Sequence, residues 1–339
     1  MKKLFFATAL LAVTLVGCNQ DQDPNPNTDN SDNKTQQLTP AQRYMLPMSV
    51  CDNAFNEAGL GVGLVDIRAI DDPNFVPALR AVSATAEPNL SWKLIEKTDL
   101  YYTAEVVVDY GTRNVLARDG RQHRGKMIVT AQVPLVSEEG AILEGRNAYE
   151  TQGTVMNARF EDWYVDNIKV EADTFVVTNT GRDDAGQWQY QVESAITLLT
   201  SATDTLTYYE ERSDRTWIEG NGNVDINTHT YSILGVQIGA TPEGVEYSTM
   251  IAEEQPLVVN VGTRYPRSGM LIVSVPTSMF TEIFPEYGAL LAAITDDDGI
   301  TFYLTFVGNN KAKVQFEYVD PVTKEPTVFE SEPYDLTNI

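Results

Sequence analysis

The feature that most limits the fold is a long alternation of apolar and polar residues over positions 101–318. The alternation has a period of two and is rich in Val, Ile, Thr and aromatic residues, which predicts β-strands with one buried face. The expected strands cover residues 104–110, 126–133, 154–160, 168–178, 187–199, 205–219, 230–239, 247–252, 270–275, 300–307 and 311–319. Turn-forming residues separate them, so successive strands should pair as hairpins. The sequence therefore predicts a mainly all-β fold, built as a large antiparallel meander or curved sheet.

One stretch, residues 278–294, departs from this pattern. Its large apolar residues are spaced as on one face of a helix: Phe280, Ile283, Phe284, Tyr287, Leu291 and Ile294. Thr277 or Ser278 is available as an N-cap, and Pro285 lies inside the stretch, so we expect two short helical pieces or a kink. We interpret the stripe as a helix that lies on the sheet rather than one that inserts into a membrane.

The N-terminus has the order of a bacterial lipoprotein signal. Lys2 and Lys3 precede an apolar run of thirteen residues at 4–16, interrupted by two threonines. That run is shorter than the ~20 residues a membrane-spanning helix needs. It ends in Leu-Val-Gly-Cys at 15–18, which resembles the lipobox, and Cys18 is therefore predicted to carry the lipid. The alternative is an ordinary secretory signal with a chance cysteine.

The residues after Cys18 concern location and domain organisation. Asn19 stands where many inner-membrane lipoproteins have Asp, so by resemblance we expect the outer membrane, on its periplasmic side or at the cell surface. Asp21 and Asp23 resemble a surface-export signal of Bacteroidota lipoproteins, or belong simply to a polar tether. We predict a cleaved signal at 1–17, a disordered tether at 18–41, an irregular region at 42–100 and an antiparallel β domain at 101–339. Within the irregular region, residues 52–60 are expected to form a short helix that ends at Gly59 or Gly61.

Charge and cysteine content exclude several classes of function. Without Lys2 and Lys3 the chain has 22 basic and 48 acidic residues, a formal charge of −26. Such a chain repels nucleic acid, so the expected attachment to a membrane is through the lipid alone. Cys51 has no partner once Cys18 carries the lipid, and we expect it to be a small buried residue. Cys51 and the two histidines do not form a zinc-type cluster, and no cofactor or metal is predicted.

Four short stretches, in this order, resemble a family of uncharacterised Bacteroidota lipoproteins. They are Asp-Tyr-Gly at 109–111, DGRQHRGK at 119–126, TNTG at 178–181 and RTWIEG at 215–220. The resemblance covers about residues 106–275, roughly half of the chain. It implies a signal-bearing lipoprotein with a β-rich domain and transfers no catalytic residue. Thr112 stands where members of the family often have Cys, and the helical stretch near Phe280 is a second departure.

A cationic cluster lies within this resemblance. Six basic residues fall within fourteen positions that contain one acidic residue, Asp119: Arg113, Arg118, Arg121, His123, Arg124 and Lys126. Guanidinium groups bind carboxylate or sulfate as a fork, so one hypothesis is a patch that binds an anionic glycan or headgroup. The alternative, which the acidic composition favours, is that neighbouring strands supply carboxylate partners.

Other groupings have plainer interpretations. Three carboxylates precede Gly299 at 296–298, but their spacing differs from a calcium-binding loop, which favours a solvated turn. Six aromatic residues suggest either a sugar-binding platform or cross-strand core pairs, with the core favoured: Trp163, Tyr164, Trp188, Tyr208, Tyr209 and Trp217. No nucleophile motif and no singled-out carboxylate pair is present, so catalytic residues are not predicted.

The sequence thus predicts a membrane-anchored, non-enzymatic lipoprotein that binds a glycan or an envelope protein, or maintains the envelope. A carrier of lipid or another apolar ligand in a half-barrel is the first alternative. It requires a large apolar cavity between sheet and helix. The second is a glycan-active hydrolase, which requires carboxylates that converge in a cleft.

Overall fold

The computed structural model describes residues 40–65, 88–117, 119–136, 147–200, 205–219, 230–242, 244–291, 299–319 and 323–336. The predicted signal peptide, Cys18, nearly all of the tether, Arg118 and the carboxylates at 296–298 lie outside these residues. Among the helices of the described ranges, none combines the length and the apolar character needed to cross a bilayer.

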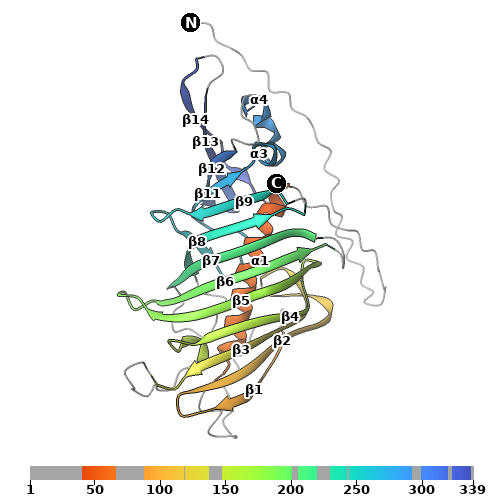
Figure 1. The fold of residues 1–339 in the computed structure, drawn as a ribbon, viewed down its shortest axis with the longest axis vertical. Coiled ribbons are helices and arrows are strands. Elements are labelled where there is room, and N and C mark those ends of the chain that lie inside the picture. The colour runs from red at the N-terminus through yellow and green to blue at the C-terminus, as the bar shows by residue number, and fades with distance from the viewer. Residues whose placement is uncertain are drawn as a thin grey trace. The chain divides into compact units, whose positions relative to one another are not determined.

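The described residues form one open antiparallel sheet of fifteen strands (Figure 1). The strands are β1 (Asn89–Lys97), β2 (Tyr101–Leu116), β3 (Gln122–Pro134), β4 (Val155–Val165), β5 (Ile168–Arg182), β6 (Trp188–Leu199), β7 (Thr205–Glu219), β8 (Thr230–Ala240), β9 (Glu246–Ile251), β10 (Leu257–Asn260), β11 (Gly269–Val275), β12 (Ile300–Gly308), β13 (Lys311–Val319), β14 (Pro326–Glu330) and β15 (Tyr334–Asp335). Neighbours in the sheet follow chain order from β1 to β9, and the order continues with β11 to β14. β10 pairs with β8 and β15 with β13. The predicted antiparallel meander is confirmed.

Each of the eleven expected strands is present. They could be predicted because the alternation of apolar and polar residues lies within each strand and does not depend on which strand pairs with it. Four strands were missed: β1, β10, β14 and β15. Three of them have five residues or fewer. β1 is longer, but it pairs only with β2 among the described strands, and its Leu94 and Ile95 are both exposed. An edge strand of this kind has no clean apolar face to show in its sequence.

A long helix occupies the N-terminal region that was predicted to be irregular. The helix α1 (Pro40–Val62) runs across several strands on one face of the sheet, where Figure 1 shows it in orange. The prediction of a short helix at 52–60 was therefore wrong in extent. Buried polar residues mask the helical period: Ser49, Asp52, Asn53 and Glu57 are buried together with Cys51 and Phe55. A helix covered on nearly all sides has no single apolar stripe.

Gly59 and Gly61 do not end this helix. A Cβ atom on Gly59 would lie 2.9 Å from the Tyr149 ring, and one on Gly61 would lie 2.9 Å from Val106 Cγ1. Both glycines therefore let α1 approach the sheet and the short helix η1 (Ala148–Glu150) closely. A glycine within a helix is a packing signal here rather than a stop signal.

The helical stretch near Phe280 is divided as expected. It forms α3 (Thr277–Ile283), η3 (Pro285–Tyr287) and α4 (Gly288–Leu291), with the break at Pro285. The helix α3 begins at Thr277, and neither Thr277 nor Ser278 is its N-cap, because Pro276 occupies that position. Phe280 is fully buried against the rings of Phe302 and Phe316. Over its described residues the apolar stripe is thus a core contact with the sheet, and Ile294 lies outside them.

Candidate functional site

The cationic cluster does not form one surface. Arg121 and His123 are buried on the face of the sheet that α1 covers. Arg124 is half-buried and Lys126 is exposed on the opposite face, and Arg113 is exposed on β2. Strand geometry explains the division, because successive side chains of a strand point to opposite faces.

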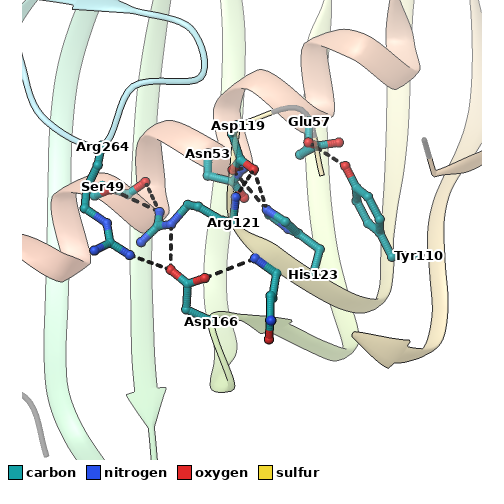
Figure 2. Close-up of polar contacts among 10 residues, drawn as sticks. Ser49, Asn53, Glu57, Tyr110, Asp119, Arg121, His123, Asp166 and Arg264 are labelled. Carbon is teal, nitrogen blue, oxygen red and sulfur yellow. Dashed lines mark hydrogen bonds and ion pairs between the residues drawn. The ribbon is translucent and has the colours of Figure 1, made fainter. Parts of the chain in front are cut away.

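Arg121 holds the strand β3 to α1 and to the β4–β5 turn. Its Nη1 donates to Ser49 Oγ at 3.0 Å, and its Nε donates to Asp166 Oδ2 at 3.1 Å (Figure 2). Arg264, distant in sequence, donates to the same Asp166 oxygen at 2.7 Å, and the Gln122 backbone N–H donates to the other. Burial would raise the pKa of Asp166, but the charge of Arg121 and these hydrogen bonds outweigh it and lower that pKa. For Arg121 the interpretation as an internal partner of a carboxylate is confirmed.

His123 belongs to the same interface between α1 and the sheet. It is fully buried and stacks on the ring of Tyr110, and its Nε2 lies 2.9 Å from Asp119 Oδ2. Asn53 of α1 donates to the same carboxylate at 2.7 Å, and the Tyr110 hydroxyl donates to Glu57 of α1 at 2.9 Å (Figure 2). Burial alone would raise the pKa of Asp119, but the His123 contact and the Arg121 backbone N–H lower it. These contacts fix the helix to β2 and β3 and leave His123 inaccessible to a ligand.

Arg124 has a different environment from Arg121. Its Nη1 donates to two amide oxygens, Asn114 Oδ1 at 3.0 Å and Asn167 Oδ1 at 3.2 Å. Its guanidinium group lies over the ring of Tyr164, 3.6 Å from the centroid. These partners are neutral, so they fix the side chain without neutralising it.

Arg124 lines an open hollow of about 520 Å³. The charged residues of its lining are Asp109, Arg124, Lys126, Glu161 and Asp162, and Gly111, Thr112, Gly125 and Tyr164 complete it. The neighbouring Tyr110, His123 and Trp163 are buried toward α1, which places the hollow on the opposite face of the sheet. Its volume is in the range of about 300–1,000 Å³ that ligand sites have.

The backbone of the hollow is irregular. Both strand pairs that form it, β2–β3 and β3–β4, shift register here, at Gly111 and at Gly125. Gly125 has a φ of +88°, and a Cβ atom there would lie 1.8 Å from the Asp162 carbonyl oxygen. Asp162 itself has a φ of 47°, in the left-handed region that non-glycine residues seldom adopt. Bulges of this kind redirect side chains next to binding sites.

A second ionic cluster is buried beneath α1 and was not predicted. Arg215 of β7 is fully buried, 2.8 Å from Asp52 Oδ1 on α1 and 2.7 Å from Glu211 Oε1. Its guanidinium lies over the Phe55 ring, 4.6 Å from the centroid. Burial and the nearby Glu211 raise the pKa of Asp52 to about 6, although Arg215 opposes the shift. Two carboxylates share one arginine, so this cluster is a charged clamp between helix and sheet rather than an accessible site.

The remaining groupings mostly belong to the core. Trp163, Trp188, Tyr209 and Trp217 are buried and belong to the core. Tyr208 is exposed, and the ring of Tyr164 lies against the guanidinium of Arg124. Cys51 is buried as expected, and burial raises the pKa of its thiol. Within the described ranges, no three His, Cys, Asp or Glu side chains come together as metal ligands would.

The fold and this geometry define a class: a mainly β protein with a sheet-spanning helix on one face and a charged hollow on the other. No family model, no curated protein and no solved structure matches the chain. The resemblance to the Bacteroidota lipoproteins therefore stays a prediction.

Proposed function

We propose that this protein is a non-enzymatic binding lipoprotein of the bacterial outer membrane or cell surface, attached through lipid on Cys18. The hollow on β2, β3 and β4 is its binding site, and an anionic group of an envelope or external ligand pairs with Arg124. The single observation that supports this most is the environment of Arg124. It is an arginine beside a hollow, held by two amide oxygens and a tyrosine ring rather than by a carboxylate.

Two other members of the cluster provide the contrast. Arg121 is paired with Asp166 at 3.1 Å, and Lys126 with Asp109 at 3.2 Å. In a chain with twice as many acidic as basic residues, direct pairing is the expected condition of a cation. Arg124 departs from it while its orientation stays fixed. A charged fork that is already oriented costs less to order when a ligand binds.

The alternatives find less support in the same residues. A half-barrel carrier needs an apolar cavity between the sheet and the helical stretch near Phe280, which would be its lid. Phe280 instead packs directly on the sheet, with ring centroids 5.1 Å from Phe302 and 5.2 Å from Phe316. A hydrolase needs a carboxylic acid in apolar surroundings and a second carboxylate opposite it. In the hollow, Asp109 is ion-paired with Lys126 and Glu161 with Arg159. A binding role therefore fits better than either alternative.

Replacing Arg124 tests the proposal. The purified protein in neutral detergent should bind an anionic polysaccharide more weakly as salt rises, because exposed charges are screened beyond ~8 Å at physiological ionic strength. Arg124→Gln should weaken binding at least tenfold, while its melting temperature stays close to that of the parent. Arg212→Gln is the matched control, since Arg212 is an exposed arginine on β7, paired with Glu193. Equal binding by both variants would refute the site.

A further inference from the structure

The charges around the hollow restrict its ligand further. Two cations and three carboxylates line it, a formal local charge of −1 when all are ionised. We propose that it binds a sugar that carries one carboxylate, a uronic acid unit of a polysaccharide. This inference rests on the proposed function and adds the chemical class of the ligand.

The cationic part of the lining accommodates one carboxylate. Arg124 presents a planar guanidinium whose orientation is fixed by Tyr164 below it and by Asn114 and Asn167 at Nη1. Lys126 is already tied to Asp109. One oriented fork pairs with one carboxylate through two parallel hydrogen bonds, and the site offers no second fork for a more highly charged group.

The anionic part of the lining suits hydroxyl groups. Ionised carboxylates only accept hydrogen bonds, and a sugar ring presents several O–H donors. Glu161 and Asp162 are exposed and both line the hollow, at the register shift where β4 has two residues opposite Gly125. The same carboxylates repel additional negative charge, Asp162 more strongly than Glu161 because Glu161 is paired with Arg159. This repulsion acts against polymers that carry several sulfates or phosphates on each unit.

These features together favour a ligand with one negative charge and many hydroxyls over a simple polyanion. Tyr164 contributes to binding by orienting Arg124 rather than by stacking on the sugar, because the guanidinium covers one face of its ring. The close approach of the two strands at Gly125, where a Cβ atom would lie 1.8 Å from the Asp162 carbonyl oxygen, sets the shape of the hollow. A site of mixed charge discriminates by charge density as well as by sign.

The test compares three polymers by calorimetry, with EDTA present so that divalent cations do not bridge carboxylates. Polygalacturonate should bind at least tenfold more tightly per sugar unit than dextran sulfate, and neutral dextran should not bind. Arg124→Gln should abolish polygalacturonate binding, whereas Arg212→Gln should not. The double variant Glu161→Gln/Asp162→Asn should gain affinity for dextran sulfate, because the repelling charges are gone and Asn tolerates the left-handed backbone.

The outcomes separate the two proposals. Tighter binding of dextran sulfate than of polygalacturonate by the parent, still dependent on Arg124, would overturn the uronic acid inference and leave the proposed site intact. Binding of neither polymer, or binding indifferent to Arg124→Gln, would overturn both. A double variant with unchanged selectivity would show that Glu161 and Asp162 do not select the ligand, which also contradicts the inference.

Discussion

At the scale of single residues, the arginines of this protein differ in what neutralises them. Arg215 shares two carboxylates in the interior, and Arg121 pairs with Asp166 below the sheet surface. Arg124 is held by amides and an aromatic ring. Because amide and carboxylate side chains have the same shape, one functional group on a neighbour decides whether Arg124 is available to a ligand.

This argument predicts the effect of Asn167→Asp. The new carboxylate would pair directly with Arg124, since Asn167 Oδ1 already lies 3.2 Å from its Nη1. Asp also tolerates the left-handed backbone of position 167, where φ is 65°. Polygalacturonate affinity should fall about tenfold, roughly 1.4 kcal/mol. The free energy of unfolding should stay within about 1 kcal/mol, as expected of a surface ion pair.

Asn157→Asp provides the control for this change. It makes the same substitution on β4 at an exposed position outside the hollow, so it measures the general effect of one more negative charge. If both variants lose affinity equally, the direct pairing with Arg124 is not the cause.

At the scale of elements, α1 is the helix whose full extent could not be predicted from the sequence. Its polar residues looked like those of an irregular segment because their partners are contributed by strands far along the chain. Asp52 meets Arg215, and Asn53 meets Asp119. Such pairings depend on how the sheet folds over the helix, and no local period records them. The strands were predictable for the opposite reason, since alternation needs only the strand itself.

Protonation of Asp52 should affect how firmly α1 is held. Its pKa is about 6 in the folded protein and near 3.8 when exposed, so the folded state keeps a proton that the unfolded chain has lost. The stabilisation is complete below the unfolded pKa and is lost as pH rises through about 6, with an upper limit of about 3 kcal/mol. Asp52→Asn keeps the size of the side chain and cannot ionise. Its melting temperature relative to the parent should therefore rise between pH 5 and pH 8.

Melting curves of the parent and Asp52→Asn across that range provide the measurement. The difference between the two proteins isolates residue 52, since every other titrating group is common to both. Parallel curves would mean that Asp52 stays ionised throughout and that Arg215 balances both carboxylates.

A second element-scale prediction concerns the close approach of α1 to β2. Glycine is roughly 0.8–1.0 kcal/mol less favourable than alanine inside a helix, and leucine ranks close to alanine, so Gly61→Leu would stabilise an unobstructed helix. The Cβ atom at position 61 would, however, lie 2.9 Å from Val106 and 3.0 Å from Val108. Overpacking typically costs about 1–3 kcal/mol, so urea denaturation should show a net loss of stability. A stabilised variant would show that the contact of position 61 with Val106 and Val108 does not limit the size of its side chain.

At the scale of the whole molecule, the sequence predicted the sheet but not the division of the cationic cluster between its two faces. His123 and Arg124 are adjacent in sequence and lie on opposite sides of β3. Arg124 and Lys126, two positions apart on β3, lie on one side as regular alternation predicts. Which of the two faces is covered depends on where α1 packs, and the alternation does not record that. The location of a binding surface is thus a property of the assembled fold.

The arrangement also bears on the proposed anchor. The helix α1 begins at Pro40, so the stretch after Cys18 leads directly into the element that is clamped to the sheet. If lipid on Cys18 holds the protein to the membrane, the attachment and the fold should be separable by changing that one residue.

Cys18→Ala is therefore expected to abolish labelling by a fatty-acid precursor and to move the protein from the membrane fraction to the soluble fraction. Stable attachment requires two acyl chains or an equivalent second signal, and the formal charge of −26 provides no attraction to anionic headgroups. The melting temperature should not change, because the clamp of α1 lies far from residue 18 in the sequence. Cys51→Ala is the control: Cys51 is fully buried, so its loss should leave both labelling and attachment intact. A Cys18→Ala protein that stayed in the membrane fraction would show that something other than the lipid anchors it. If labelling were lost with Cys51→Ala and kept with Cys18→Ala, the acyl group would be on Cys51 instead.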